Sequence, residues 1–344
     1  MLKKYGFEQS VADPCLYTRK EEGKFAMIVV IVDDLLIATE AKEDADKLIT
    51  NIRSHYKIKN LGQAKYFIGM HLKYDMGKQL LLNQKLYIEN MGHRFGQDGC
   101  KPTKTQSDSN SKLRKDMSSP PTTKPYRSLV GSLIYATLTR PDIAVSVSQL
   151  SRYLEAPQES HWKAAIRVLR FLITTKERVL ILKIDPTALQ TKLLTDSTWN
   201  SNPDNSRSRT GYAILFFGCL IIWKTKLQPH TTLSSTEAEY VALNDGAKEM
   251  LWAIRLLHAM NINVQKPVPI FIDNQSAMAL AKHKMIKPRT KHIALRYHWI
   301  REKLSDKTFV LKYVPSKENL ADLFTKILSQ AQQAKLLKGK MSDL

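Results

Sequence analysis

Residues 234–260 read Ser-Ser-Thr-Glu-Ala-Glu-Tyr-Val-Ala-Leu-Asn-Asp-Gly-Ala-Lys-Glu-Met-Leu-Trp-Ala-Ile-Arg-Leu-Leu-His-Ala-Met, and their spacing predicts one long helix. Glu239 shares one face of this helix with small and apolar residues, namely Ala242, Leu243, Gly246 and Met250. An interior glycine costs roughly 1 kcal/mol relative to alanine, so Gly246 indicates close packing on a sheet. The carboxylate of Glu239 should therefore point toward that sheet.

Strands and further helices surround this long helix. Strands are predicted at residues 192–195, 211–217, 220–223, 269–272 and 309–313. Helices are predicted at residues 274–283 and 319–328, and residues 179–182 form a short apolar lead-in. This order of elements predicts a compact α/β unit over residues 178–330.

Four acidic residues fall where this order brings them together: Asp196 and Asp273 at strand ends, Glu239 on the long helix and Asp322 at the start of the last helix. Carboxylates at the carboxyl ends of neighbouring strands point into one crevice. Four such acids could bind two Mg²⁺ ions about 3.5–4 Å apart, with Mn²⁺ as a substitute. One ion would position an attacking water, and the other would stabilise the leaving oxygen of a phosphodiester.

Each aspartate also has a purely structural interpretation. Asp273 could cap the helix that follows it, Asp322 could be a first-turn acid, and Asp196 could belong to an Asx turn. Individually these interpretations are the simpler ones, whereas the combination of acids favours a metal site.

A second acid of the long helix, Glu237, competes with Glu239 for the metal-binding role. Its side of the helix is more mixed and is expected to be wetter. We therefore predict that Glu237 is a first-turn acid behind a cap at Ser234 or Ser235, and that Glu239 is the ligand.

The N-terminal region contains a hairpin with two acids at its tip. Residues 25–32 predict a strand buried on both faces, and residues 35–38 resume it after Asp33 and Asp34. Adjacent carboxylates repel each other, which a divalent metal or water would offset, although aspartates also suit an ordinary turn. A helix at residues 41–56 and strands at 64–74 and 79–82 complete an α+β region.

The middle of the chain changes character twice. Residues 101–125 are rich in Pro, Ser, Thr and Lys and predict an extended linker. Helices are then predicted at residues 126–139, 142–154 and 161–174. The predicted parts are residues 1–100, the linker 101–125, a helical subdomain 126–177, the α/β unit 178–330 and a basic, frayed tail 331–344.

The composition points to a polyanionic partner. The chain has 344 residues with 53 Lys and Arg against 32 Asp and Glu, a formal net charge of +21. Such a surface concentrates nucleic acid, while attraction to an anionic membrane or simple solubility are the blander interpretations. The most apolar window, residues 25–38, is too short and too acidic for a membrane span, so no membrane partner is expected. Three cysteines without metal-ligand spacing predict a reducing compartment and no structural zinc.

Two segments are candidates for nucleic-acid contacts. Arg207 and Arg209 alternate with hydroxyl residues, a mixture that suits phosphate but also occurs in solvated loops. Lys291 and His292 lie in the basic stretch 282–298, whose aromatic residues could stack on bases or face the core.

Many blocks of this sequence resemble the Pol polyprotein of copia-type LTR retrotransposons. Blocks similar to its reverse transcriptase are GFEQS (6–10), ADPCLY (12–17) and NLGQAKYFIG (60–69). YRSLVG (126–131) and TRPDI (139–143) resemble its connection region. Blocks similar to its ribonuclease H are LSSTEAEY (233–240), DNQSA (273–277), TKHI (290–293), and AD (321–322) followed by TK (325–326).

The resemblance implies a fold and a function for each part. Residues 1–100 would be a partial polymerase palm with Asp33 and Asp34 as metal ligands, joined by a helical connection to a ribonuclease H-like mixed five-stranded sheet flanked by helices. The third carboxylate and the fingers of such a palm would lie upstream, so the chain is expected to be a C-terminal Pol fragment without polymerase activity.

The leading hypothesis is a metal-dependent ribonuclease H acting on RNA–DNA hybrids, with other parts of the Pol polyprotein as protein partners. The alternative is a non-catalytic nucleic-acid-binding remnant, supported by the charge and by Ile31, where the family usually has tyrosine. The upstream motifs argue against an unrelated nuclease or integrase. The expected location is the cytoplasm, in a virus-like particle if the element is active, with the nucleus as the alternative.

Overall fold

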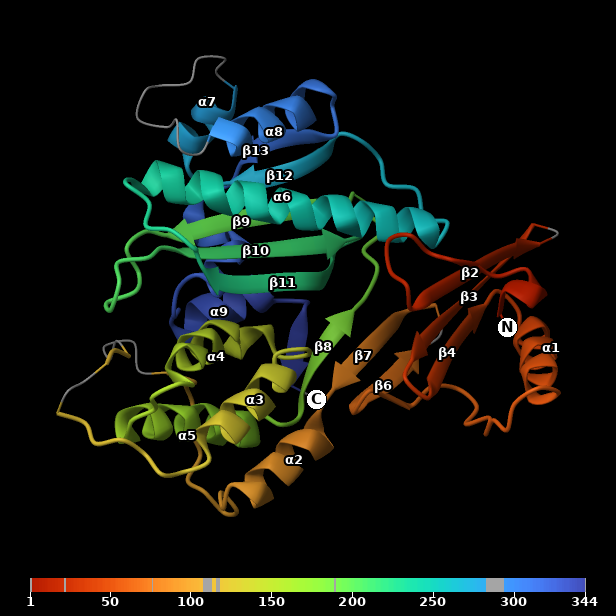
Figure 1. Cartoon of the computed structure of the whole chain (residues 1–344), viewed down its shortest axis with the longest axis horizontal. Coiled ribbons are helices and arrows are strands. Elements are labelled where there is room, and N and C mark those ends of the chain that lie inside the picture. The colour runs from red at the N-terminus through yellow and green to blue at the C-terminus, as the bar shows by residue number, and fades with distance from the viewer. Residues whose placement is uncertain are drawn as a thin grey trace. The chain divides into compact units, whose positions relative to one another are not determined.

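A computed structural model describes residues 2–343 except 22, 76, 108–112, 116–117, 189 and 283–293. The chain forms two compact units. The smaller unit comprises Met1–Lys65 and Lys248–Gln265, and the larger comprises Tyr66–Ala247 and Lys266–Leu344. Figure 1 labels most of their helices and strands.

The smaller unit contains the predicted acidic hairpin. Its antiparallel sheet has the order β1 (Glu8–Gln9), β2 (Leu16–Glu21), β3 (Lys24–Ile31), β4 (Asp34–Thr39), and it also contains η1 (Leu2–Tyr5) and α1 (Lys42–Arg53). The hairpin and the helix after it are confirmed. The prediction that its first strand is buried on both faces is wrong, because only Ala26 and Ile28 of β3 are buried, against Leu48 and Ile52 of α1. One helix covers one face of this sheet.

A second sheet lies in the larger unit and joins distant parts of the sequence. Its antiparallel order is β14 (Met341–Asp343), β8 (Arg178–Leu182), β7 (Gln79–Asn83), β6 (Met70–Asp75), β5 (Tyr66–Phe67). The lead-in at residues 179–182 is therefore a paired strand. This sheet pairs strands from both sides of the predicted boundaries at residues 100 and 177. The two compact units therefore do not coincide with the five predicted parts, and that division stays a prediction.

The C-terminal residues are folded, so the prediction of a frayed tail is wrong. After α9 (Gln330–Leu337), the chain adds β14 to β8. Leu336 and Leu337 are buried in a core cluster with Leu194 and Phe324. The lysine-rich composition concealed this short apolar pair.

The predicted helical cluster is confirmed, with one additional helix. It contains α2 (Lys85–Arg94), α3 (Tyr126–Ala136), η2 (Pro141–Ile143), α4 (Ala144–Leu150), η3 (Ser151–Tyr153) and α5 (Glu159–Thr174). The additional helix is α2, whose Ile88 and Met91 join the common core. Next to Phe171 of this core, the buried carboxylate of Asp142 pairs with Arg140 at 2.8 Å and with Arg178 at 3.2 Å.

The predicted mixed five-stranded sheet is also confirmed. Its order is β11 (Cys219–Leu227), β10 (Arg209–Phe216), β9 (Lys192–Thr198), β12 (Val268–Ile272), β13 (Phe309–Tyr313). Strands β11, β10 and β9 are antiparallel, and β12 is parallel to both β9 and β13. The remaining elements are α6 (Ser235–Ala259), α7 (Gln275–Lys282), α8 (Ala294–Ser305), η5 (Ser316–Glu318) and η6 (Leu320–Phe324). The last predicted helix, 319–328, is thus only the short 3₁₀ segment η6.

Helix α6 packs closely on this sheet, as its small-residue face predicts (Figure 1). A Cβ added at Gly246 would lie 2.9 Å from Thr195 Cγ2 and 3.2 Å from Leu193 Cδ1. Leu193 and Thr195 of β9 therefore face α6. Because side chains alternate along a strand, Leu194 and Asp196 face the opposite side, where η6 packs.

Two further expectations concern the described residues. None of their helices combines the length and hydropathy needed to cross a bilayer. Cys15, Cys100 and Cys219 are all free thiols.

Candidate acidic metal centre

Three of the predicted acids converge at one edge of the mixed sheet. One carboxylate oxygen from each of Asp196, Asp273 and Asp322 lies within 4.8 Å of the other two. Asp196 belongs to β9, Asp273 directly follows β12, and Asp322 lies in η6. Among the described residues, this is the one group of potential metal ligands that meets this criterion.

Asp196 is fixed inside a strand, so the Asx-turn interpretation is wrong. It pairs with Gly211 of β10 and is 1% exposed. The hydroxyl of Thr325 donates a hydrogen bond to Asp196 Oδ2. A Cβ at Gly211 would lie 2.6 Å from Thr325 Cγ2 and 2.9 Å from the carbonyl carbon of Phe324. Only glycine at this position lets η6 approach Asp196 so closely.

Asp273 does not cap the following helix, so that interpretation is also wrong. Asn274 is the cap, since its Oδ1 accepts a hydrogen bond from the backbone N–H of Ala277 at 2.9 Å. The Asp273 side chain is half-buried, and its Oδ2 accepts a hydrogen bond from the hydroxyl of Ser316. This bond orients the carboxylate in the acidic centre.

Asp322 is held in place by Asn319, a residue that the sequence did not single out. Asp322 lies in the first turn of η6, and Asn319 caps that turn by accepting a hydrogen bond from the N–H of Ala321 at 3.1 Å. The Asn319 side-chain amide also donates to the backbone oxygen of Thr195 at 2.9 Å. Asn319 therefore ties η6 to β9 next to Asp196.

Glu239 reaches the same edge from α6. Its Oε1 accepts a hydrogen bond from the backbone N–H of Ser197 at 3.2 Å. The side chain is buried, and its Oε2 has no hydrogen-bond partner among the described residues. An unpaired buried carboxylate oxygen is costly unless something such as a cation compensates for it.

Glu237 is a first-turn acid behind a cap at Ser234, as predicted. Its Oε2 accepts from the N–H of Leu233 at 2.9 Å, and its own N–H donates to Ser234 Oγ at 3.2 Å. The first bond ties the residue before the helix to Glu237, and the second makes Ser234 the N-cap. The prediction of a wetter face holds only at Lys248, which is exposed, because Glu237, Val241 and Asn244 are buried.

Lys326 contributes a positive charge that the sequence analysis missed. Its Nζ lies 3.0 Å from Asp322 Oδ1 and 3.4 Å from Asp196 Oδ2. The spacing of four residues from Asp322 was the available signal, since such pairs meet on one side of a helical turn.

Burial dominates the electrostatics of the centre. It raises the pKa of Asp196 to about 7, opposed by Lys326 and reinforced by Asp322 and Asp273. Burial, then the charges of Asp196 and Asp273, raise the pKa of Glu239 to about 9. Burial also raises the pKa of Asp322. Protons therefore compensate part of the negative charge at neutral pH, and a bound cation would displace them.

The donor set fits a hard divalent cation. All the ligand atoms are carboxylate oxygens, which Mg²⁺ and Mn²⁺ prefer over nitrogen or sulfur. The three converging aspartates can hold such an ion, and Glu239, whose Oε2 is unpartnered, lies near them without belonging to that group.

The two hairpin acids are arranged differently. Asp33 and Asp34 lie at the exposed turn between β3 and β4. No third acid joins them to form a candidate metal site within the part of the chain that the structure describes.

The basic candidates divide into three cases. Arg207 is exposed, as a phosphate contact requires. Arg209 is 2% exposed and donates hydrogen bonds to Ser148 Oγ at 2.7 Å and Thr225 Oγ1 at 3.0 Å, so its prediction as a surface contact is corrected to an interior role. Lys291 and His292 lie outside the described residues.

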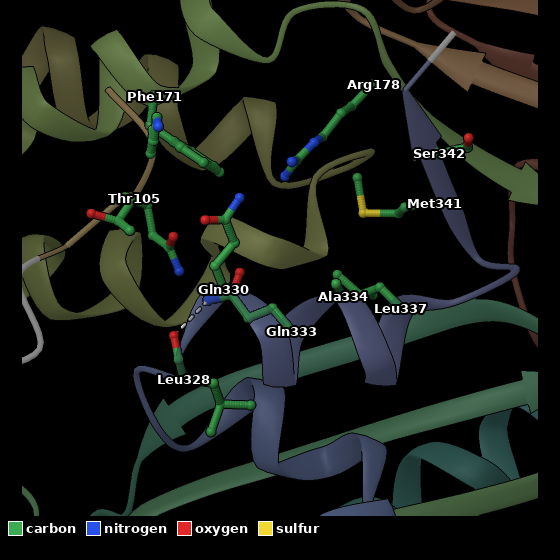
Figure 2. Close-up of a pocket in the computed structure, with 12 residues that line it drawn as sticks. Thr105, Phe171, Arg178, Leu328, Gln330, Gln333, Ala334, Leu337, Met341 and Ser342 are labelled. Carbon is green, nitrogen blue, oxygen red and sulfur yellow. Dashed lines mark hydrogen bonds between the residues drawn. The ribbon is translucent and has the colours of Figure 1, made fainter. Parts of the chain in front are cut away.

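A pocket elsewhere in the larger unit lacks acidic residues in its lining (Figure 2). Phe171, Arg178, Gln333 and Met341 are among the residues around it, and Gln333 donates a hydrogen bond to the backbone oxygen of Leu328 at 3.2 Å. Its lining offers amides and cations rather than metal ligands. The acidic centre is thus the stronger candidate for chemistry.

Comparisons with known proteins agree with the sequence blocks. Residues 1–107 match the family described as reverse transcriptase (RNA-dependent DNA polymerase). The chain is 38% identical over 340 residues to the retrovirus-related Pol polyprotein from transposon TNT 1-94 of Nicotiana tabacum, covering 95% of this chain and 25% of that protein. It is 32% identical over 253 residues to a putative transposon Ty5-1 protein of Saccharomyces cerevisiae, covering 72% of this chain and 82% of that protein. The chain belongs to the Pol polyprotein family of copia-type retrotransposons.

This Pol chain spans about a quarter of the length of the tobacco polyprotein. Among solved structures, it resembles the N-terminal RNase H domain of a Mycobacterium tuberculosis protein fused to maltose-binding protein, with a TM-score of 0.29 and 14% identity over 40% of this chain and 91% of that one. That similarity is low, so the sheet order and strand directions are what describe the fold of this Pol chain.

Proposed function

We propose that this Pol chain is a ribonuclease H-type endonuclease that hydrolyses the RNA strand of RNA–DNA hybrids. The observation that carries the proposal is the meeting of Asp196, Asp273 and Asp322 at the sheet edge, with Glu239 contributing a buried oxygen without a partner. Two Mg²⁺ ions are the proposed cofactors, with Mn²⁺ as a substitute.

The four acids would hold the metal ions, and neighbouring groups would orient the acids. When bound, divalent ions lower the pKa of water and stabilise the leaving oxygen of a phosphodiester. The hydroxyls of Thr325 and Ser316 and the N–H of Ser197 each fix one carboxylate, on Asp196, Asp273 and Glu239 respectively. A set of ligands fixed before binding loses little freedom when it takes up a cation.

The hairpin acids support no second activity in our proposal. Asp33 and Asp34 are exposed, and nucleotidyl transfer needs both metal ions held in a defined geometry. We propose that this 344-residue chain does not synthesise DNA.

A second candidate function is non-catalytic binding of nucleic acid. The net charge of +21 favours it, because phosphate contacts alone give sequence-independent affinity. Both candidates predict binding to hybrids, and only the first predicts cleavage.

A cleavage assay on the whole chain separates the two. With an end-labelled RNA–DNA hybrid and Mg²⁺, the parent should cut the RNA strand, and EDTA should abolish cutting. Asp273→Asn should lose activity and keep its melting temperature, because Asn274 remains the cap of α7. The exposed Asp75→Asn is the matched control and should retain activity. Binding without cutting by the parent would favour the second candidate, and full activity of Asp273→Asn would show that the centre is misassigned.

A further inference from the structure

Lys326 is built into the acidic centre at one edge. Its backbone N–H donates to the carbonyl oxygen of Asp322 at 3.1 Å, which fixes the start of the side chain directly after η6. The ammonium then lies between Asp322 Oδ1 at 3.0 Å and Asp196 Oδ2 at 3.4 Å. The side chain is 37% exposed, so its end has a path to solvent.

The residue before Lys326 strengthens the same edge. The hydroxyl of Thr325 donates to Asp196 Oδ2, the oxygen that also faces the ammonium. Thr325 can approach so closely because Gly211 has no side chain. Asp196 Oδ2 and Asp322 Oδ1 are therefore both occupied by donors from this chain.

Glu239 and Asp273 make no such ion pair among the described residues. Glu239 Oε2 is buried without a hydrogen-bond partner among the described residues, and the half-buried Asp273 is oriented by a neutral hydroxyl from Ser316. The centre is thus asymmetric, because an ammonium of this chain neutralises Asp196 and Asp322 while Glu239 and Asp273 face no ammonium at ion-pair distance.

We propose that Lys326 serves as a resident cation at the Asp196–Asp322 edge, so that the free protein takes one divalent ion on the carboxylate oxygens that the ammonium leaves free and a second only by displacing the ammonium. This inference rests on the proposed function in one respect, namely that the same acids bind metal. Like charges a few ångströms apart repel strongly in a poorly solvated site, so a divalent ion cannot share this edge with the ammonium. Lys326 is a positioning residue that sets the order in which metal ions enter.

Titration of the whole chain with Mn²⁺ alone tests the proposal. Isothermal titration calorimetry measures the affinity of each site, and electron paramagnetic resonance measures the Mn²⁺ that stays unbound. The parent should show one strong site and a second that is much weaker. Lys326→Met keeps most of the side-chain length without the charge, and the second ion should bind at least tenfold more tightly. Lys326→Arg keeps the charge and should behave as the parent.

The proposal would be overturned by two equally strong sites in the parent, by an unchanged second affinity in Lys326→Met, or by no metal bound by either protein. A second affinity in Lys326→Arg that matches Lys326→Met would do the same, because charge would not be the cause. Circular dichroism and a melting curve check each variant, and Lys326→Gln replaces Lys326→Met if the latter does not fold.

The readout also distinguishes this inference from the proposed function. If the parent cuts no hybrid and Lys326→Met still gains a tight second site, the ribonuclease proposal fails and the role of Lys326 stands. If the parent cuts hybrid and the second affinity does not change, only the role of Lys326 fails.

Discussion

Replacing Glu239 with glutamine tests the centre through its protonation. Burial, reinforced by Asp196 and Asp273, raises the pKa of Glu239 to about 9 in the folded protein, against an ordinary value of 4.5. Between these two pH values the folded state holds one more proton than the unfolded state. The free energy of unfolding of the metal-free protein therefore falls as pH rises through this window.

The size of the effect follows from the width of the window. One proton costs about 1.4 kcal/mol per pH unit, so the parent should lose about 4 kcal/mol between pH 5 and pH 8 through this group. Glutamine resembles the neutral carboxyl group, retains an oxygen for the Ser197 N–H and does not ionise. Glu239→Gln should match the parent at pH 5 and be more stable by about 4 kcal/mol at pH 8.

Urea unfolding in EDTA at a series of pH values measures this difference, and hybrid cleavage in Mg²⁺ measures the activity. Glu239→Gln should not cut hybrid. Glu237→Gln is the matched control. It weakens the hydrogen bond from the Leu233 N–H, should lower the free energy of unfolding by about 1 kcal/mol, and should leave most activity intact. A stability difference between Glu239→Gln and the parent that is constant with pH would refute the protonation argument. Cleavage by Glu239→Gln but not by Glu237→Gln would show that the wrong helix acid has been assigned.

Three other predictions concern different parts of the chain. Gly211→Ala should lower the free energy of unfolding in urea by about 1–3 kcal/mol and slow hybrid cleavage, because the new Cβ pushes η6 away from Asp196. Unchanged stability and cleavage rate would contradict the contacts described for this glycine. Arg207→Ala should weaken hybrid binding and reduce the slope of log affinity against log salt by about 1, without changing the melting temperature. Fluorescence-anisotropy titrations at several salt concentrations measure this slope. An unchanged slope would show that Arg207 makes no phosphate contact. Primer-extension assays should detect no DNA synthesis by this chain in Mg²⁺ or Mn²⁺, and any extended primer that disappears in Asp33→Asn would reverse that expectation.

Periodic patterns predicted most of the fold. The apolar runs on both sides of Asp33 and Asp34 gave the hairpin, and the small-residue face of α6 gave its packing on the sheet through Gly246. Helix α2 was missed because its apolar positions, Ile88 and Met91, are few and gain their burial from α3 and α5. Local sequence carries little information about such distant packing.

The acids of the centre were predictable because each sits at a recognisable place in the order of elements. The groups that orient them were not, since they act across long sequence separations. Thr325 lies 129 residues from Asp196, and Asn319 lies 124 residues from Thr195. Arg209 failed for the opposite reason: an arginine among hydroxyl residues suits both a phosphate contact and a buried hydrogen-bonded position, and only the packing of Ser148 against it decides between them.

The alternation of β9 explains why this site needs both layers of the larger unit. Thr195 faces α6, and Asp196 faces η6, so Glu239 and Asp196 arrive from opposite sides and meet only at the edge, where Ser197 donates its N–H to Glu239. Loosening either layer would separate the carboxylates and lower their mutual repulsion, which favours an open centre in the absence of cations. Protons on Glu239 and Asp196 and the ammonium of Lys326 oppose this separation. The protons on Glu239 and Asp196 and the ammonium of Lys326 stabilise the metal-free fold. A divalent ion that binds the same carboxylates must therefore displace them.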